Sequence, residues 1–565
     1  MIQQANSEKG MGFIIGASSV GTLIEWYDFY IFGMLATIIS TQFFPEDSGT
    51  SALLSTLAIF AAGFIVRPFG ALVFGRLGDM IGRKHTFLLT LVLMGGSTFA
   101  IGLVPGFKTI GWAAPIIVLV LRLVQGLALG GEYGGAATYV AEHAPAHRRG
   151  YWTSWIQTTA TLGLFLALGI IILIRQSQGV EKFSAEWGGW RYPFWISLLL
   201  VIVSIFIRMR MSESPMFAKV KAEGKHSINP LKESFGNRAN FKMVLLALFG
   251  AVMGQGVVWY TGQFYAQSFI ENICKVNFVD SRDILLIAIL LATPFFVIFG
   301  SLSDKIGRKW IIMTGLLLAI CSYHIIFTQF LNLTDAAARR DLIDISKTTK
   351  SAAIATFDSK DRSKMLVSTH YDSVYTDGAV YSYTYVDTIL LSKAYTGNTN
   401  AIAYSLTSNS SNTTSDSIMV TAKVIPGVSF VNGITNVFAV NKAGKPGLVI
   451  EKALDRSTFW KMVFLVAIMV VYVTMVYGPI AAFLVELFPT KIRYTSMSLP
   501  YHIGNGVFGG LVPFLGTLIV EFTKTKENLA GDPLAGLWYP VGVAALCLII
   551  GVVYLRNHID EDVLD

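Results

Sequence analysis

The stretch Gly75-Arg-Leu-Gly-Asp-Met-Ile-Gly-Arg-Lys84 lies between two long apolar runs, and a close copy, Gly300-Ser-Leu-Ser-Asp-Lys-Ile-Gly-Arg-Lys309, occurs later in the chain. A second pair of similar phrases follows in the same order. The segments 142–149 and 486–493 both read E-x-x-P-x-x-x-R. Two internal matches in the same order predict two related halves that run in parallel, an arrangement that suits alternating access around a central site.

Apolar residues make up 53% of the 565 residues and charged residues only 14%, whereas soluble domains average about 25% charged residues. The apolar excess is gathered into runs that are each about long enough to cross ~30 Å of hydrocarbon. The fold class is therefore an all-α polytopic membrane protein with two six-helix pseudo-repeats. We predict twelve transmembrane helices, near residues 12–40, 53–74, 86–104, 113–140, 152–174, 192–210, 243–270, 284–302, 310–331, 458–484, 497–520 and 537–555.

Lys and Arg residues gather in the loops on one side of these helices, and a longer basic stretch from Arg208 to Lys232 falls on the same side. Positively charged loops stay in the cytoplasm, so both termini are expected there. The net charge of +8 then reports topology and indicates no nucleic-acid partner. Glu25 and Asp28 interrupt the first apolar run, which favours a retained helix over a signal peptide.

The second half holds an insertion, because the two E-x-x-P-x-x-x-R phrases lie farther apart than the two copies of the first phrase. Residues 380–386 and 418–425 alternate like strands, and Asp377-Gly378 and Asn432-Gly433 are hairpin-turn dipeptides. We predict a small β-rich extracytoplasmic insert between helices nine and ten. A disordered spacer is the alternative, because 408–417 is low in complexity. The predicted domain limits are 1–211, 212–241 (cytoplasmic linker), 242–331, 332–455 (insert) and 456–565.

The motif G-R-x-G-D-x-x-G-R-K after helix two, Arg122-x-x-x-Gly126 on helix four and Glu213-Ser-Pro215 after helix six resemble the major facilitator superfamily of transporters. Within it, 25–29 (EWYDF) and 130–135 (GGEYGG) are similar to bacterial metabolite:proton symporters. The resemblance covers all twelve helices and not 332–455. We expect a functional monomer whose partners are a small metabolite, protons and the lipid bilayer.

Ionisable side chains are costly within a membrane, so each one is a candidate for function. Glu25 and Asp28 share one face of the first helix, roughly 20 Å above its cytoplasmic end and near the depth of Arg122. Glu132 and Arg67 are expected to form a second layer, closer to the cytoplasm. Three carboxylates facing two guanidinium groups leave one acid free to carry a proton, and we rank Asp28 first, then Glu25, then Glu132. A purely structural network is the alternative.

Helix seven places Gln255, Trp259 and Gln263 one turn apart, with Tyr260 adjoining. Facing a cavity, these side chains would offer hydrogen bonds and an aromatic wall to a small polar solute. Facing another helix, they would hold the two helices together.

The candidate solutes follow from the charges and rings near mid-membrane. Arg122 favours an organic anion, such as a mono- or dicarboxylate. Trp26 and Tyr27 also allow a zwitterionic osmolyte, such as a betaine or proline, through cation–π contacts.

In the superfamily that the chain resembles, the Asp of the first phrase (Asp79) lies near a neighbouring helix N-terminus and ties the two halves together at the inner face. An anion there is stabilising by up to about 1 kcal/mol; the alternative is that Asp79 only balances nearby cations in water. The second copy has Ser301 in place of Arg76, so its latch is expected to be weaker. The predicted gating and latch residues are Asp79, Arg83, Arg67, Asp304 and Arg308.

Two further patterns resemble ligand-binding motifs but do not predict a nucleotide or a metal site. Residues 504–509 read G-x-G-x-x-G inside an apolar run with no preceding strand, and Pro145 interrupts the helix that would align His143 with His147 for a metal. We predict no metal, no cofactor and no enzyme. The expected function is proton-coupled symport of a small polar organic metabolite. The rival is a transporter-like receptor or binding protein whose working part is the insert.

Overall fold

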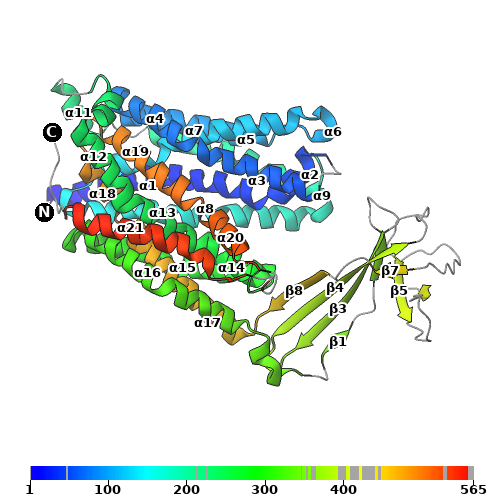
Figure 1. Ribbon diagram of the computed structural model, residues 1–565. Coiled ribbons are helices and arrows are strands. Elements are labelled where there is room, and N and C mark those ends of the chain that lie inside the picture. Colours follow the sequence, from blue (N-terminus) through cyan, green and yellow to red (C-terminus); the bar gives the residue numbers. More distant parts are fainter. Residues whose placement is uncertain are drawn as a thin grey trace. The chain divides into compact units, whose positions relative to one another are not determined.

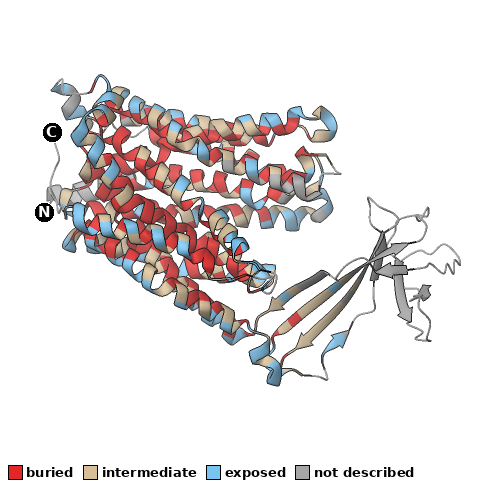
Figure 2. Cartoon of the chain, viewed as in Figure 1, coloured by how far each residue is buried: buried red, intermediate tan, exposed pale blue. Residues whose placement is uncertain are grey.

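The computed structural model describes residues 2–45, 49–209, 214–223, 227–344, 347–350, 354–357, 364–391, 402–407, 419–422, 440–442, 447–525, 528 and 531–557. The chain forms two compact units (Figure 1). One contains Met1–Ala266, Leu286–Phe327 and Leu465–Asp565, and the other contains Gln267–Leu285 and Thr328–Phe464. The first unit is built from helices, and its buried residues lie between those helices (Figure 2).

The first half of the sequence forms α1 to α11. Their bounds are α1 Ile2–Met34, α2 Ala36–Phe43, α3 Gly49–Ile65, α4 Arg67–Ile81, α5 Arg83–Ile101, α6 Phe107–Ile110, α7 Ala113–His143, α8 Arg149–Gln178, α9 Val180–Ser184, α10 Tyr192–Met209 and α11 Pro215–Ala222. Short 3-10 turns, η2 Ala146–Arg148 and η3 Gly189–Arg191, precede α8 and α10.

The second half forms α12 to α21. Their bounds are α12 Arg238–Ala247, α13 Met253–Tyr260, α14 Ala266–Asn272, α15 Phe278–Ile306, α16 Arg308–Leu333, α17 Arg456–Tyr477, α18 Ile480–Leu487, α19 Arg493–Ile503, α20 Val512–Phe522 and α21 Trp538–Tyr554. Three π-helical turns, η5 Leu248–Val252, η6 Thr261–Tyr265 and η8 Gly504–Gly509, join α12 to α13, α13 to α14 and α19 to α20.

Membrane-spanning length is widespread among these helices. Within the described residues, 11 helical stretches are long and apolar enough to cross a membrane. They coincide with the second to twelfth predicted spans, and the 33-residue α1 occupies the position of the first. The predicted class, a mostly helical polytopic protein, is therefore confirmed.

The repeated phrase has the same backbone structure in both copies. Gly82 ends α4 at φ 119°, and Gly307 lies between α15 and α16 at φ 97°. Positive φ favours glycine, because a side chain would be strained there. The Arg that follows each glycine begins the next helix. The glycine therefore sets a tight corner, and the phrase encodes a helix–corner–helix unit used twice.

Small residues let α7 approach its neighbours closely. A methyl group at Gly126 would overlap the carbonyl oxygen of Gly63, and one at Gly130 would overlap that of Arg67. These glycines therefore serve helix packing.

The second unit carries a sheet of eight strands in the order β6-β5-β2-β3-β4-β7, with β1 beside β3 and β8 beside β4. The bounds are β1 Thr349–Lys350, β2 Ile354–Phe357, β3 Lys364–Val374, β4 Val380–Leu391, β5 Ile402–Thr407, β6 Met419–Ala422, β7 Val440–Lys442 and β8 Gly447–Ala453. The predicted strand at 380–386 lies in β4, and Asp377-Gly378 forms the turn that precedes it, with Gly378 at φ 93°. Asn432-Gly433 and 408–417 lie outside the described residues.

Charged contacts hold the end of the sheet at which the Asp377-Gly378 turn joins β3 to β4. The Arg339 guanidinium donates to Asp377 and Asp455, each at 2.6 Å. Burial raises the pKa of Asp455, but hydrogen bonds from Thr458 and Arg339 outweigh it and lower that pKa overall. The loop between α14 and α15 also pairs with β8, because the Asn277 N–H donates to the Lys452 carbonyl at 2.9 Å and the Lys452 N–H donates to the Lys275 carbonyl at 2.8 Å. The insert, which lies between α16 and α17 in the sequence, therefore also contacts a second loop.

Candidate functional site

A small cavity lies in the first unit, among residues from both halves of the sequence. Its volume is about 30 Å³, enough for about two water molecules. The helices are thus closed around it, and a larger solute requires them to separate. The lining residues are Glu25, Trp26, Phe29, Phe64, Arg67, Tyr133, Trp259, Tyr260, Tyr477, Tyr501, His502, Asn505 and Gly506.

Glu25 and Arg67 are the charged residues of this lining. Glu25 is 8% exposed, and its Oε2 atom has no hydrogen-bond partner among the described residues. The same holds for Nε of Arg67, whose guanidinium lies 4.4 Å from the centre of the Phe64 ring. A carboxyl group and a guanidinium group, each with an unused hydrogen-bonding atom, thus share one cavity.

Aromatic rings form most of the cavity wall. Trp26 of α1 and Trp259 of α13 meet with ring centres 5.6 Å apart. Tyr133 of α7 stacks on Tyr501 of α19 at 3.7 Å, and the Tyr501 hydroxyl hydrogen-bonds to that of Tyr477. The Trp26–Trp259 and Tyr133–Tyr501 contacts join the first half of the chain to the second, so the wall must open when the halves move apart.

Asp28 and Arg122 belong to a polar network and do not line the cavity. Asp28 is 1% exposed and accepts hydrogen bonds from Thr98 at 3.0 Å and Ser197 at 2.6 Å. Arg122 donates to Gln125 and lies 4.3 Å from the centre of the Phe32 ring. The guanidinium packs on aromatic rings of its own half, and the predicted contact of Arg122 with the solute stays a prediction.

Glu132 makes an ion pair with Arg208 at 2.6 Å, and both side chains are 1% exposed. Thr90 donates to the other carboxylate oxygen at 2.8 Å. The predicted layer of Arg67 with Glu132 is thus wrong, because Arg208 is the partner of Glu132. Arg208 reaches inward across α1 at Gly21, where a methyl group would overlap its guanidinium.

The other predicted solute contacts divide in two. Trp26, Trp259 and Tyr260 line the cavity. Gln255 instead exchanges two hydrogen bonds with Asn505, at 3.0 and 3.1 Å, and therefore joins two helices. Tyr27 is buried and donates to the Pro193 carbonyl at 2.8 Å. Gln263 is also buried, and it is not part of the lining.

The first predicted latch is formed. Asp79 is fully buried, and its carboxylate accepts from the main-chain N–H of Tyr494 at 3.3 Å and of Thr495 at 2.8 Å. These residues open α19, so the anion lies at a helix N-terminus. The contact joins α4 of the first half to α19 of the second. The Arg83 side chain lies outside the described residues.

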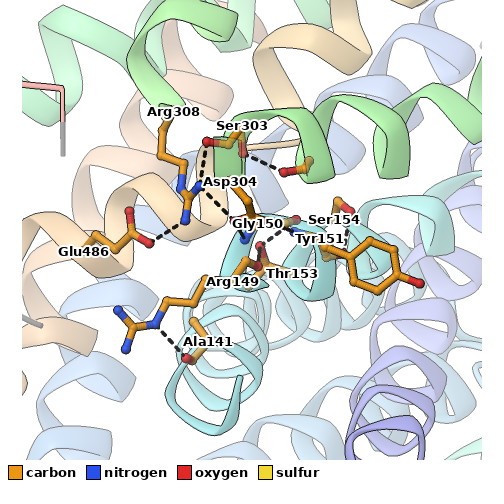
Figure 3. Close-up of polar contacts among 11 residues, drawn as sticks. Ala141, Arg149, Gly150, Tyr151, Thr153, Ser154, Ser303, Asp304, Arg308 and Glu486 are labelled. Carbon is orange, nitrogen blue, oxygen red and sulfur yellow. Dashed lines mark hydrogen bonds and ion pairs between the residues drawn. The ribbon is translucent and has the colours of Figure 1, made fainter. Parts of the chain in front are cut away.

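The second latch has the same construction (Figure 3). Asp304 accepts from the main-chain N–H of Gly150 at 2.7 Å and Tyr151 at 2.8 Å, at the start of α8. Arg308 holds Asp304 at 2.8 Å and Glu486 at 2.9 Å. The carboxylates of Asp79 and Asp304 make the same pair of main-chain contacts, and the weaker second latch stays a prediction.

The E-x-x-P-x-x-x-R phrases also meet between the halves. Glu142, from the first phrase, pairs with Arg493, from the second, at 3.0 Å. Ser214, which precedes α11, donates to the same carboxylate. The two repeated phrases therefore supply one continuous set of contacts that closes one end of the helical unit.

Sequence reasoning missed several lining residues, notably Tyr133, Tyr477, Tyr501 and His502. His502 could have been found, because an ionisable side chain within a predicted span is a candidate for function. The tyrosines give no such signal, since isolated tyrosines in apolar helices are common. Their role becomes visible only when three helices, α7, α17 and α19, bring them together.

Comparisons with known proteins agree with this architecture. The family described as "Sugar (and other) transporter" matches residues 14–228. The proline/betaine transporter of Salmonella typhimurium is 34% identical over 314 residues, which is 53% of this chain and 61% of that protein. The α-ketoglutarate permease of Escherichia coli K12 is 34% identical over 308 residues, 54% of this chain and 69% of that protein.

A solved structure shares the fold. The proton:xylose symporter XylE, described as a member of the major facilitator superfamily, superposes with a TM-score of 0.58 at 15% identity over 99% of this chain and 98% of that one. The helical fold, the paired latches and the transporter relatives lead to one conclusion. The chain belongs to the major facilitator superfamily of membrane transporters.

Proposed function

We propose that the protein is a proton-coupled symporter that imports a small zwitterionic metabolite across the bacterial inner membrane by alternating access. The observation that carries this proposal is the cavity that holds both Glu25 and Arg67 within an aromatic wall. Such a symporter requires an acid that can take up the proton and attract a cationic group. It also requires a cation that can bind a carboxylate.

The solute class follows from this lining. Arg67 can hold a carboxylate through charge-assisted hydrogen bonds, while Glu25 and the faces of Trp26 and Trp259 favour a cationic group. The name of the Salmonella relative, a proline/betaine transporter, supports the same class. A small organic anion is the second candidate, supported by Arg67 and by the α-ketoglutarate permease relative.

We assign the transported proton to Glu25, ahead of Asp28 and Glu132, whereas the sequence placed Asp28 ahead of Glu25. Asp28 already accepts two hydroxyl hydrogen bonds, and Glu132 is ion-paired with Arg208. Glu25 lines the cavity and keeps an unpartnered oxygen. It is therefore the carboxylate that a proton and a solute can reach together.

The transport cycle we propose uses the whole arrangement. Twelve helices form two six-helix bundles in a functional monomer, with both termini in the cytoplasm and 332–455 outside it. The latches of Asp79 and Asp304 then hold the cytoplasmic face closed. Their release, together with separation of the Tyr133–Tyr501 stack, would open the cavity inward.

Uptake into proteoliposomes tests the proposal. Wild-type protein should accumulate labelled L-proline or glycine betaine only under an imposed inward proton gradient. Glu25→Gln should lose this accumulation and keep exchange of labelled for unlabelled solute, because exchange moves no net proton. Asp28→Asn is the matched control and should keep accumulation.

The result that contradicts the assignment is accumulation by Glu25→Gln at the wild-type level. A wild-type protein that binds solutes and moves none of them would instead favour the receptor alternative, with the insert as the working part.

A further inference from the structure

Three buried polar atoms without partners converge on the one cavity. They are Oε2 of Glu25, Nε of Arg67 and Nε2 of His502. More than nine in ten buried polar groups in folded proteins have a hydrogen-bond partner. Three exceptions on the lining of one cavity of the described structure therefore point to a ligand that completes them.

His502 supplies the least expected of these atoms. It is 3% exposed and lies on α19, with its ring 5.2 Å from that of Tyr501. Its Nε2 atom has no hydrogen-bond partner among the described residues. In the neutral tautomer that carries its proton on Nδ1, Nε2 has a lone pair and accepts a hydrogen bond.

The lining thus offers two acceptors and one cationic donor to a ligand. Oε2 of Glu25 and Nε2 of His502 accept, and Arg67 donates. Asn505 also lines the cavity, but its amide is already engaged with Gln255. Even when Glu25 carries the proton, its carboxyl keeps an oxygen that accepts.

This arrangement distinguishes between two kinds of zwitterion. The aromatic wall attracts any cation, including a fully methylated ammonium. A fully methylated ammonium has no N–H group, so it leaves both acceptors buried and unsatisfied. A secondary ammonium has two N–H groups, one for each acceptor, and its carboxylate remains for Arg67.

We propose that the cavity selects a zwitterion with a primary or secondary ammonium group over one whose nitrogen is fully methylated, and that His502 determines this selectivity. The proposal rests on the proposed function and narrows its solute class. A site that hydrogen-bonds an N–H group rejects an analogue that lacks it, because the site's own polar atoms are then left unpaired.

The test uses L-proline and N,N-dimethyl-L-proline, which differ only in the two N-methyl groups. Binding of labelled L-proline to the purified full-length protein is measured by scintillation proximity, with each compound as the unlabelled competitor. We expect L-proline to compete at least about tenfold better. His502→Leu should narrow this ratio at least about fivefold, because it removes one acceptor, whereas His502→Gln, which retains an acceptor, should keep most of it.

The outcomes separate the two proposals. Equal or better competition by the dimethyl compound overturns the inference, and so does the absence of binding by either compound. A strong preference for L-proline in binding, without proton-driven uptake, upholds the inference and overturns the transport function. The competition ratio of the two compounds on the wild-type protein tests the selectivity even where a His502 variant fails to fold.

Discussion

Neutralising the second latch should open the end of the molecule that it closes. Asp304→Asn replaces a carboxylate that accepts two main-chain hydrogen bonds, at 2.7 and 2.8 Å, by an amide with one accepting oxygen. Asp79→Asn makes the same change where the distances are 3.3 and 2.8 Å. Because the distances at Asp304 are shorter, Asp304→Asn should destabilise the closed state at least as much as Asp79→Asn.

The magnitude follows from these contacts. Hydrogen bonds to a charged group contribute about 1.5–3 kcal/mol and neutral ones about 0.5–1.5 kcal/mol. Losing one bond and the charge of the other should therefore cost the closed state about 2 kcal/mol. That is a shift of about 30-fold in the equilibrium between the closed and open states.

Thiol labelling measures this shift. Thr138 is buried against Met497 at the interface of α7 and α19, so Thr138→Cys should react slowly while that interface is closed. In a background with Cys274, Cys321 and Cys547 changed to Ala, Asp304→Asn should raise the labelling rate about 30-fold. Asp283→Asn, an exposed acid on the same helix, should leave the rate unchanged.

A rate raised by Asp79→Asn and untouched by Asp304→Asn would refute this reasoning. It would restore the weaker second latch that the sequence suggested.

Four further predictions concern stability. Arg208→Met should destabilise the helical unit by about 3 kcal/mol or more, because it leaves the Glu132 carboxylate buried without its partner; adding Glu132→Leu should restore the melting temperature in detergent, and no restoration would argue against the pair. Arg339→Ala should loosen the end of the sheet at the Asp377-Gly378 turn, and faster proteolysis within 347–446 would measure this. Since the folded-state pKa of Asp455 is lowered, its contribution should be full above the unfolded value of about 3.9 and be lost only as pH falls below it; loosening of the wild-type sheet between pH 5 and 8 would contradict this. Gly130→Ala should lower stability by about 1–3 kcal/mol through overlap with α4, whereas Gly169→Ala, which meets open space, should not, and equal effects would count against the close packing.

Features carried by local sequence were predictable. The phrase at 75–84 and its copy marked two places where one helix ends and the next begins. The resemblance to the superfamily implied that the acid of the phrase contacts a neighbouring helix N-terminus, and the carboxylates of Asp79 and Asp304 do so. Ionisable residues within apolar runs likewise brought Glu25 and Arg67 to attention, which needs only the local sequence.

What could not be predicted depends on how helices face one another. Depth counted along a helix suggested Arg67 as the partner of Glu132, but depth does not give the direction around the helix axis. The face predicted for Gln255, Trp259 and Gln263 assumes a regular helix. Gln255 and Trp259 share a face of the regular helix α13, but Asn505 engages the Gln255 amide. The π-helical turn that follows α13 contains Gln263 and rotates it out of phase with the other two.

The Glu132–Arg208 pair also bears on how the protein is made. The two residues are 76 positions apart, so at about 5–20 residues per second the carboxylate emerges from the ribosome roughly 4–15 s before its guanidinium. During that interval the nascent chain holds an uncompensated acid in α7. Arrival of α10 supplies the missing charge and draws α10 across α1 at Gly21. Synthesis of the last helix of this half is thus the event that locks the first, and a chain truncated before Arg208 should remain in the membrane as a loosely packed, protease-sensitive intermediate.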